Sequence, residues 1–232
     1  MEGNDEFYRD TTLLITGGVG SIGREIAKNL LEYETTTVRI LDNNETRLFD
    51  LKQERQSKKL RTLVGDIRDM YRLKRAIENV DIVLHVAALK HVLLCEYNPF
   101  EAVKTNVTGT QNLIDACIEE EVKKVIFTSS DKAVNPTNVM GTTKLLAERL
   151  ITSANYYNKR VRKTVFSSVR FGNVLGSRGS VIPLFKKQIE KGESITITDK
   201  EMTRFVMPMR DAINLLLKAT EITQGGEIFV LR

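Results

Sequence analysis

A glycine-rich turn between a predicted strand and a predicted helix constrains the fold of this chain more than any other feature. The apolar run at residues 12–16 leads into the sequence TGGVGSIG, and apolar residues then recur at helical spacing through residues 21–31. Glycines allow a tight turn and a close approach of the backbone to a pyrophosphate, while the helix N-terminus supplies N–H groups. Strand, turn and helix together predict a dinucleotide-binding βαβ unit.

Predicted strands and helices alternate through the first 171 residues, and the pattern loosens afterwards. This alternation indicates a parallel, doubly wound α/β sheet, whose strands are buried on both faces and so consist of continuous apolar runs. We expect a Rossmann domain for NAD(P) in residues 1–171. A small substrate-binding part in residues 172–232 is interleaved with the last sheet elements, and its truncation is left open. The predicted strands are 12–16, 38–41, 63–64, 81–86, 122–128, 165–171, 194–197 and 227–231, and the helices are 21–31, 102–118, 138–154, 181–190 and 210–220.

Composition argues against several other classes of protein. The net charge of +5 comes from scattered basic residues without interleaved aromatic side chains, which disfavours nucleic-acid binding but suits an anionic small substrate. Cys95 and Cys117 lack metal-ligand spacing, and His85 and His91 have no second ligand cluster, so we expect buried thiols and no metal site. The polar, acidic start and the lack of a long apolar run predict no signal peptide, no membrane segment and a cytoplasmic location.

The predicted cofactor site surrounds the glycine turn. Asp42 ends the second strand, where a carboxylate can bond both ribose hydroxyls and repel a 2′-phosphate, so we favour NAD over NADP. A glycine turn that binds no nucleotide is the alternative. The full predicted set is Gly17, Gly20, Ser21, Ile22, Gly23, Asp42, Asn43, Asp66, Ile67, Ala87, Ala88, Lys90, Asn106 and Lys144.

Seven motifs extend the pattern over nearly the whole chain. They are, in order, TGGVGSIG, GDIRD, HVAALKHV, TNVTGTQNLIDA, SSDKAVNPTNVMGTTK, RFGNVLGSRGSVIPLF and MTRF. In this order they resemble the CapD-like branch of the extended short-chain dehydrogenase/reductase superfamily, and most of all its UDP-N-acetylglucosamine 4,6-dehydratases. The segments AALKHV and SSDKA…NP…GTTK are much more specific to this branch than the glycine turn.

The resemblance implies a reaction and a set of catalytic residues. A 4,6-dehydratase oxidises carbon 4 of the sugar, removes the proton on carbon 5, expels the hydroxyl on carbon 6 and returns hydride to carbon 6. By resemblance, Lys144 binds the nicotinamide ribose, Ser129 orients the substrate hydroxyl, Asp131 is the acid for the carbon 6 hydroxyl and Lys132 is the carbon 5 base. A base at Lys132 needs a pKa near neutrality, which burial beside Lys144 would produce. A loop ion pair between Asp131 and Lys132 is the alternative.

Met140 departs from the superfamily pattern, which usually has Tyr four positions before the catalytic Lys. A thioether neither donates nor accepts a proton at neutral pH. Some proteins of the resembling branch also carry Met here, so the substitution does not imply an inactive enzyme. We hypothesise that Asp131, the only carboxylate between Ser129 and Lys144, takes the proton of the carbon 4 hydroxyl directly or through water.

The later motifs supply the predicted substrate contacts. Arginines can bind phosphate in bidentate fashion, although a solvated surface role is open for each one taken alone. The resemblance implies a homo-oligomer, because a four-helix bundle between subunits is common in this superfamily, and helices 102–118 and 138–154 are the candidates for it. The predicted substrate contacts are Lys90, Ser130, Asn173, Arg178, Ser180, Val181 and Arg204.

Three functions remain open from the sequence. The first is a 4,6-dehydratase acting on UDP-N-acetylglucosamine in polysaccharide biosynthesis. The second is a nucleotide-sugar 4-epimerase or another extended SDR enzyme, and the third is a non-catalytic NAD-binding scaffold or sensor. The Asp131–Lys132 pair favours dehydration, because simple epimerisation needs no elimination pair.

Overall fold

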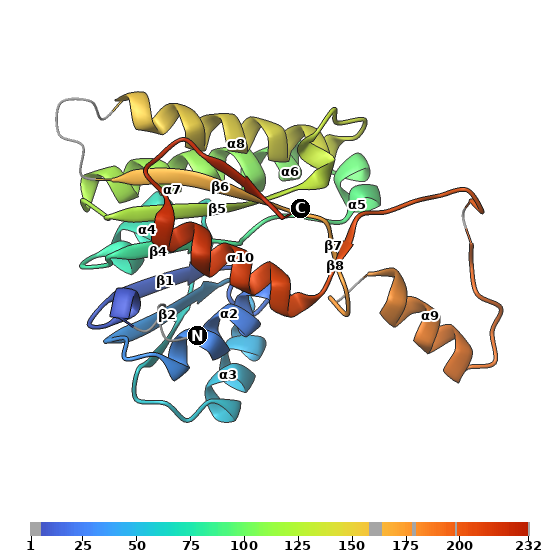
Figure 1. The fold of residues 1–232 in the computed structure, drawn as a ribbon, viewed down its shortest axis with the longest axis horizontal. Coiled ribbons are helices and arrows are strands. Elements are labelled where there is room, and N and C mark those ends of the chain that lie inside the picture. The colour runs from blue at the N-terminus through green and yellow to red at the C-terminus, as the bar shows by residue number, and fades with distance from the viewer. Residues whose placement is uncertain (1–5, 158–163, 178–179, 198, 232) are drawn as a thin grey trace.

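Seven parallel strands form the central sheet of the protein (Figure 1). The computed structural model describes residues 6–157, 164–177, 180–197 and 199–231. The strand order is β3-β2-β1-β4-β5-β6-β9, so the direction of winding reverses between β1 and β4, where nucleotides bind in sheets of this kind. The strands are β1 (Thr12–Thr16), β2 (Thr37–Asp42), β3 (Leu60–Val64), β4 (Ile82–His85), β5 (Lys124–Ser130), β6 (Val165–Phe171) and β9 (Ile228–Val230).

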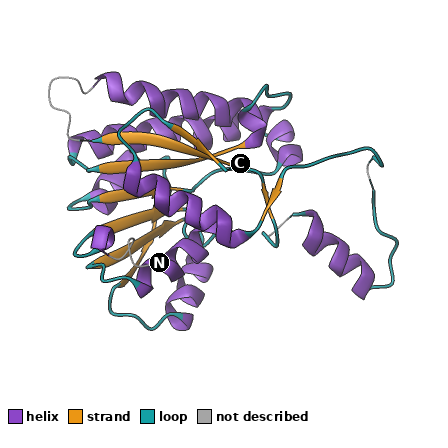
Figure 2. Ribbon diagram, viewed as in Figure 1, coloured by secondary structure: helices purple, strands orange, loops and turns teal. Residues whose placement is uncertain are grey.

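Helices cover both faces of the sheet (Figure 2). One hydrophobic core joins the sheet to α2 (Ser21–Glu32), α3 (Glu45–Glu54) and α10 (Met209–Ile222). A second core joins the opposite face to α4 (Met70–Ile77), α7 (Gly109–Glu119) and α8 (Val139–Tyr157). The predicted doubly wound α/β architecture is therefore confirmed, and burial on both faces explains why its strands are apolar runs.

The helix predicted over residues 102–118 is observed as an uninterrupted helical run, but it begins upstream and contains a π-helical turn. The chain forms α6 (Pro99–Val103), a π-helical turn η1 (Lys104–Thr108) and then α7. Pro99 is suited to the first turn of a helix, where its missing N–H costs nothing, and this moves the start upstream.

Three helices were not predicted: α3, α4 and α5 (Val92–Tyr97). The first two begin at side-chain caps, since Asn44 accepts from the Arg47 N–H and Asp69 from the Arg72 N–H. Such caps are the sequence signals that would have located these helices.

A projecting arm, defined here as residues 180–197 and 199–205, leaves the body after β7 (Asn173–Val174) (Figure 1). Its helix α9 (Val181–Glu190) agrees with the prediction but buries no residue. The strand predicted at 194–197 is absent, and those residues are exposed. An alternating sequence forms a stable strand only when a neighbouring strand pairs with it, which explains the error. The arm returns through β8 (Val206–Met207), which pairs with β7.

Candidate functional site

The glycine turn after β1 is shaped by steric contacts that exclude any side chain. Gly17 has a φ of +66°, and a Cβ there would lie 2.6 Å from the Ala87 Cα atom. A Cβ on Gly23 would lie 2.5 Å from the Gly18 Cα atom. Gly20 is the N-cap residue of α2 but has no side chain to accept from the first N–H groups of the helix, and the first turn carries no acidic side chain. The positive end of the helix dipole therefore favours an anion at this turn.

Asp42 lies beside the glycine turn at the carboxyl end of β2. Its Oδ2 atom accepts the Val19 N–H at 3.2 Å, and its Oδ1 atom accepts the Asn44 N–H at 3.0 Å. A carboxylate has about four acceptor positions, so two backbone bonds fix Asp42 and leave capacity for ribose hydroxyls. The turn and Asp42 together fit the adenosine diphosphate part of a dinucleotide.

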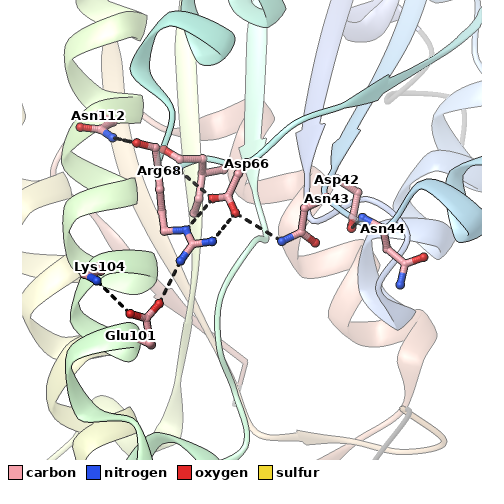
Figure 3. A network of polar contacts seen from close by, with 9 residues as sticks. Asp42, Asn43, Asn44, Asp66, Arg68, Glu101, Lys104 and Asn112 are labelled. Atoms are coloured by element: carbon pink, nitrogen blue, oxygen red, sulfur yellow. Dashed lines mark hydrogen bonds and ion pairs between the residues drawn. The ribbon is translucent and has the colours of Figure 1, made fainter.

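Asp66 lies at the end of β3 in an ion-pair network (Figure 3). Arg68 donates from Nε at 3.0 Å and from Nη2 at 2.8 Å to the two oxygens of Asp66, and Asn43 donates to Oδ2 at 3.4 Å. Burial by itself would raise the pKa of Asp66, but the hydrogen bonds and charge of Arg68 lower it. Arg68 also donates to Glu101, so the network joins the loop after β3 to α6. Sequence reasoning missed Arg68, although it lies within the GDIRD motif.

Two further predicted cofactor contacts contribute to packing. Ile67 is buried against Gly109, where a Cβ would lie 2.7 Å from the Ile67 Cδ1 atom. Ala87 lies across from Gly17, so its backbone forms one wall of the turn. Both positions therefore define how closely the chain segments around the glycine turn approach one another.

Lys144 and Ser129 lie together at the carboxyl end of β5. The Lys144 Nζ atom donates to the Thr128 carbonyl oxygen at 2.8 Å and lies 4.5 Å from the centroid of the Phe127 ring. Burial lowers the pKa of Lys144 to about 7. Ser129 is 4% exposed, and its Oγ atom has no hydrogen-bond partner within the described part of the chain. A buried hydroxyl of this kind is able to bond a substrate.

Asp131, Lys132 and Asn173 form a polar cluster next to Ser129. The Lys132 Nζ atom donates to Asp131 Oδ1 at 3.1 Å and to Asn173 Oδ1 at 3.0 Å, while the Ser130 hydroxyl donates to Asp131 Oδ1 at 2.8 Å. The structure thus brings the SSDK and RFGN motifs together. The expected burial of Lys132 is not observed: its side chain is 30% exposed, and it is Lys144 whose pKa falls to about 7.

Met140 packs into a small apolar cluster. It is 4% exposed and contacts Cys95 and Ala102, with Val92 and Val139 at the edge of the cluster. The side chain therefore joins α8 to α5 and α6. A flexible thioether is suited to filling such an irregular space.

The remaining predicted substrate residues lie at or beyond the edge of the site. Ser180 and Val181 begin α9 on the arm. Arg204 is exposed and donates to the Thr203 carbonyl oxygen at 2.7 Å, and Lys90 is exposed after β4. The Phe205 carbonyl oxygen accepts the Asn173 N–H at 2.7 Å, which holds the MTRF motif against the RFGN motif. Arg178 lies outside the described residues.

An ion pair between α8 and β6, one helical turn after Lys144, was not predicted. Arg170 on β6 donates to both oxygens of Glu148, at 2.9 and 2.7 Å, and Glu148 is fully buried. Glu148 follows Lys144 by four residues on α8, so the two share a helix face, and this spacing was the available signal. The pair fixes α8 against β6, because a bidentate carboxylate–guanidinium contact allows one relative orientation.

The described residues contain neither a membrane-spanning helix nor a cluster of metal ligands. None of their helices is long and apolar enough to cross a membrane. No group of three His, Cys, Asp or Glu residues among them is arranged to hold a metal ion.

The strand order, the glycine turn and Asp42 define a protein with a Rossmann dinucleotide-binding fold. Residues 13–232 match the family described as polysaccharide biosynthesis protein, and the chain belongs to this family. The nucleotide-sugar dehydratases and epimerases of the extended SDR superfamily are thus its relatives.

Three curated relatives and two solved structures illustrate the similarity. An uncharacterized membrane protein of Methanocaldococcus jannaschii is 63% identical over 97% of this chain and 68% of its own length. An inverting UDP-N-acetylglucosamine 4,6-dehydratase of Campylobacter jejuni is 46% identical over 96% and 67%, and a UDP-glucose 4-epimerase of Rickettsia canadensis is 43% identical over 96% and 66%. The structure of Pen from Bacillus thuringiensis has a TM-score of 0.95 and 52% identity over 97% of this chain and 72% of that one. The dTDP-glucose 4,6-dehydratase DesIV of Streptomyces venezuelae has a TM-score of 0.84 and 23% identity over 94% and 74%, which is a likeness of fold.

Proposed function

We propose that this protein is a nucleotide-sugar 4,6-dehydratase that acts on UDP-N-acetylglucosamine and uses bound NAD. The observation that carries the proposal is the Asp131–Lys132–Asn173 cluster beside Ser129 and Lys144. The name of the Campylobacter jejuni relative supports the same substrate and reaction.

The chain has residues that fit each part of the cofactor. The glycine turn and the start of α2 would bind the pyrophosphate, Asp42 the adenosine ribose and Lys144 the nicotinamide ribose. When bound, NAD supplies the reversible removal of hydride from the sugar. The carboxylate of Asp42 would repel a 2′-phosphate, which favours NAD over NADP.

Asp131 and Lys132 can divide the proton transfers between them. The Oδ1 atom of Asp131 accepts from Ser130 and Lys132, whereas Oδ2 has no hydrogen-bond partner among the described residues. We assign to Oδ2 the proton of the carbon 4 hydroxyl, which Asp131 then donates to the carbon 6 hydroxyl as water leaves. Protonation of Asp131 removes the negative charge that pairs with Lys132, so the partly exposed Lys132 can release its own proton to solvent. The neutral amine then removes the carbon 5 proton and returns it to carbon 5 after reduction at carbon 6. This scheme balances both protons without a tyrosine at position 140.

The variant Asp131→Asn tests the proposal. Incubation of wild type with UDP-N-acetylglucosamine should give a product lighter by one water in mass spectrometry, and the variant should give neither this product nor reduced nicotinamide. Asp115→Asn, an exposed carboxylate on α7, is the matched control and should keep wild-type activity. A variant at Asp131 that still reduced NAD would contradict the role at carbon 4. No product from any UDP-sugar, despite bound NAD, would favour the non-catalytic function.

A 4-epimerase is the second candidate, since relatives with that name are 43% identical to this chain. The two activities differ in the mass of the product, because an epimerase product has the mass of its substrate.

We also propose that residues 172–232 are the substrate-binding part and that the protein is a homo-oligomer.

A further inference from the structure

A row of buried polar side chains crosses the protein from the strand before the glycine turn to the helix that carries Lys144. The row consists of five side chains that are each at most 4% exposed: Thr16, His85, Thr110, Asn106 and Thr143. The Thr16 Oγ1 and His85 Nδ1 atoms are 2.7 Å apart, and His85 Nε2 and Thr110 Oγ1 are 3.1 Å apart. Thr110 Oγ1 donates to the Asn106 carbonyl oxygen at 2.7 Å, and Asn106 Nδ2 donates to Thr143 Oγ1 at 3.0 Å. The row therefore links β1, β4, α7, the π-helical turn and α8.

The donors in this row assign one tautomer to His85. The single hydroxyl proton of Thr110 points to the Asn106 carbonyl oxygen, so Thr110 Oγ1 must accept from an Nε2–H group. Burial, and after it the charge of Lys144, lower the pKa of His85 to about 3, so the ring is neutral and Nδ1 accepts the Thr16 hydroxyl. The ring is thus a fixed link between two hydroxyl groups.

Asn106, at the end of this row, holds the loop after β4. Its Oδ1 atom accepts the Leu89 N–H at 2.8 Å, and its Nδ2 atom donates to the Leu89 carbonyl oxygen at 3.0 Å. Thr143, which accepts from the same Nδ2 atom, donates to the Met140 carbonyl oxygen at 2.9 Å. The amide therefore couples the loop before Lys90 to the first turns of α8, and π-helical turns of this kind are frequent at functional sites.

We propose that His85 is a positioning residue of the active site, which acts through Thr110 and Asn106 to set the loop at Leu89–Lys90 against the part of α8 that carries Lys144. The proposal rests on the proposed function, because this loop and Lys144 face the sugar and the nicotinamide ribose in that reaction. His85 itself touches neither. Misplacement of either segment by about 1 Å would lower turnover on the order of 100-fold.

Three substitutions of His85 separate positioning from simple packing. His85→Gln keeps a donor near the position of Nε2, His85→Asn places its amide near Nδ1 instead, and His85→Leu has no donor. We expect kcat to fall about 100-fold in the Asn and Leu variants and less than about tenfold in the Gln variant, with KM for the UDP-sugar changed little. Equal losses in all three, in proportion to lost thermal stability, would overturn the proposal.

Amide hydrogen exchange at Leu89 gives a second measurement that needs no turnover. The Leu89 N–H is the group that Asn106 holds, so its exchange should be slow in wild type and His85→Gln and faster in His85→Asn and His85→Leu. This measurement tests the link even if the wild type has no dehydratase activity, so failure of the proposed function and failure of this proposal are distinguishable. Leu89 exchange unchanged in His85→Leu would overturn the proposal.

A matched pair of threonines provides the control. Thr110 and Thr220 are both fully buried and both donate to the carbonyl oxygen four residues earlier, at 2.7 and 2.8 Å. Thr110→Val should lower kcat and speed exchange at Leu89, whereas Thr220→Val should lower stability alone. Nitrogen-15 NMR of His85 should show the Nε2–H tautomer. Equal kcat losses in the two threonine variants, or an Nδ1–H tautomer, would refute the proposal.

Discussion

Side chains at the carboxyl end of the sheet are held by burial and hydrogen bonds, whereas those of the projecting arm are exposed to solvent. At the carboxyl end of the sheet, Lys144 and Asn106 are buried and bonded to neighbouring backbone. On the arm, α9 buries no residue, and exposed apolar side chains include Ile189 at 62% and Phe205 at 81%. Changes in the sheet should therefore affect stability and cofactor binding together, whereas changes in the arm should affect substrate affinity with little loss of stability.

The largest difference in stability should come from substitutions of two glycines that have similar φ angles. Gly17, in the turn after β1, and Gly176, near the arm, have φ values of +66° and +74°, but only the first would place a Cβ within 4 Å of another atom. We expect Gly176→Ala to lower the free energy of unfolding by about 1 kcal/mol through backbone strain. Gly17→Ala should cost about 3 kcal/mol or more through its clash with Ala87, and should abolish NAD binding. Urea unfolding and a fluorescence titration with NADH measure both effects, and equal costs would contradict the comparison.

Lys144 should give the sheet a pH-dependent stability that the arm lacks. The pKa of this lysine falls from 10.5 to about 7 on folding, so the unfolded chain binds more protons between these values. The free energy of unfolding should therefore rise with pH across this window, by an amount on the order of 5 kcal/mol.

Lys144→Met should remove this rise and stabilise the protein below pH 7, because a neutral side chain has no charge to bury. Lys200→Met, an exposed arm residue, is the control and should leave the pH dependence unchanged. Urea unfolding of the protein without cofactor, at pH values from about 6 to 10, measures the difference. A wild type and a Lys144→Met variant with parallel pH profiles would show that the lysine is not held neutral.

The same contrast explains what the sequence could and could not reveal. Strands β1 and β6 were predicted at their observed bounds because burial on both faces makes a continuous apolar run. The motifs that carry the family resemblance also singled out Asp131, Lys132 and Asn173, which the structure joins through the hydrogen bonds of Lys132. The hydrogen-bond partners of His85 were not predicted, because they lie 69 and 25 residues away along the chain and only the folded protein brings them together. On the arm, residues 194–197 have the composition of a strand but no neighbour, a fact that local sequence does not contain.

Glu227 offers a smaller test at the last strand of the sheet. Its carboxylate accepts from the Ser167 and Thr223 hydroxyls and from the Gln224 and Gly225 N–H groups. Burial by itself would raise the pKa of Glu227, but these bonds lower it from 4.5 to about 2. The stability that they provide is complete above pH 4.5 and is lost as the pH falls towards 2.

Glu227→Gln should therefore cost about 2 kcal/mol at pH 7 and progressively less as the pH falls below 4.5. Glu193→Gln on the arm should cost less than about 1 kcal/mol, since Glu193 and its partner Lys191 are both 55% exposed. Guanidinium unfolding at several pH values compares the two variants. Equal costs, or a cost of Glu227→Gln that does not change with pH, would show that these four bonds contribute no specific stability to the sheet.

The smallest effect on stability should come from the arm itself, at Arg204. Its exposed guanidinium bonds a neighbouring carbonyl oxygen, so Arg204→Gln should change the free energy of unfolding by less than about 0.5 kcal/mol. Loss of a charged contact to the diphosphate should raise KM for the UDP-sugar about tenfold while NAD affinity stays unchanged. Arg210→Gln is the matched control, because that side chain is 86% exposed and pairs with Asp211. If both variants leave KM unchanged, Arg204 is a solvated surface residue and does not bind the substrate diphosphate.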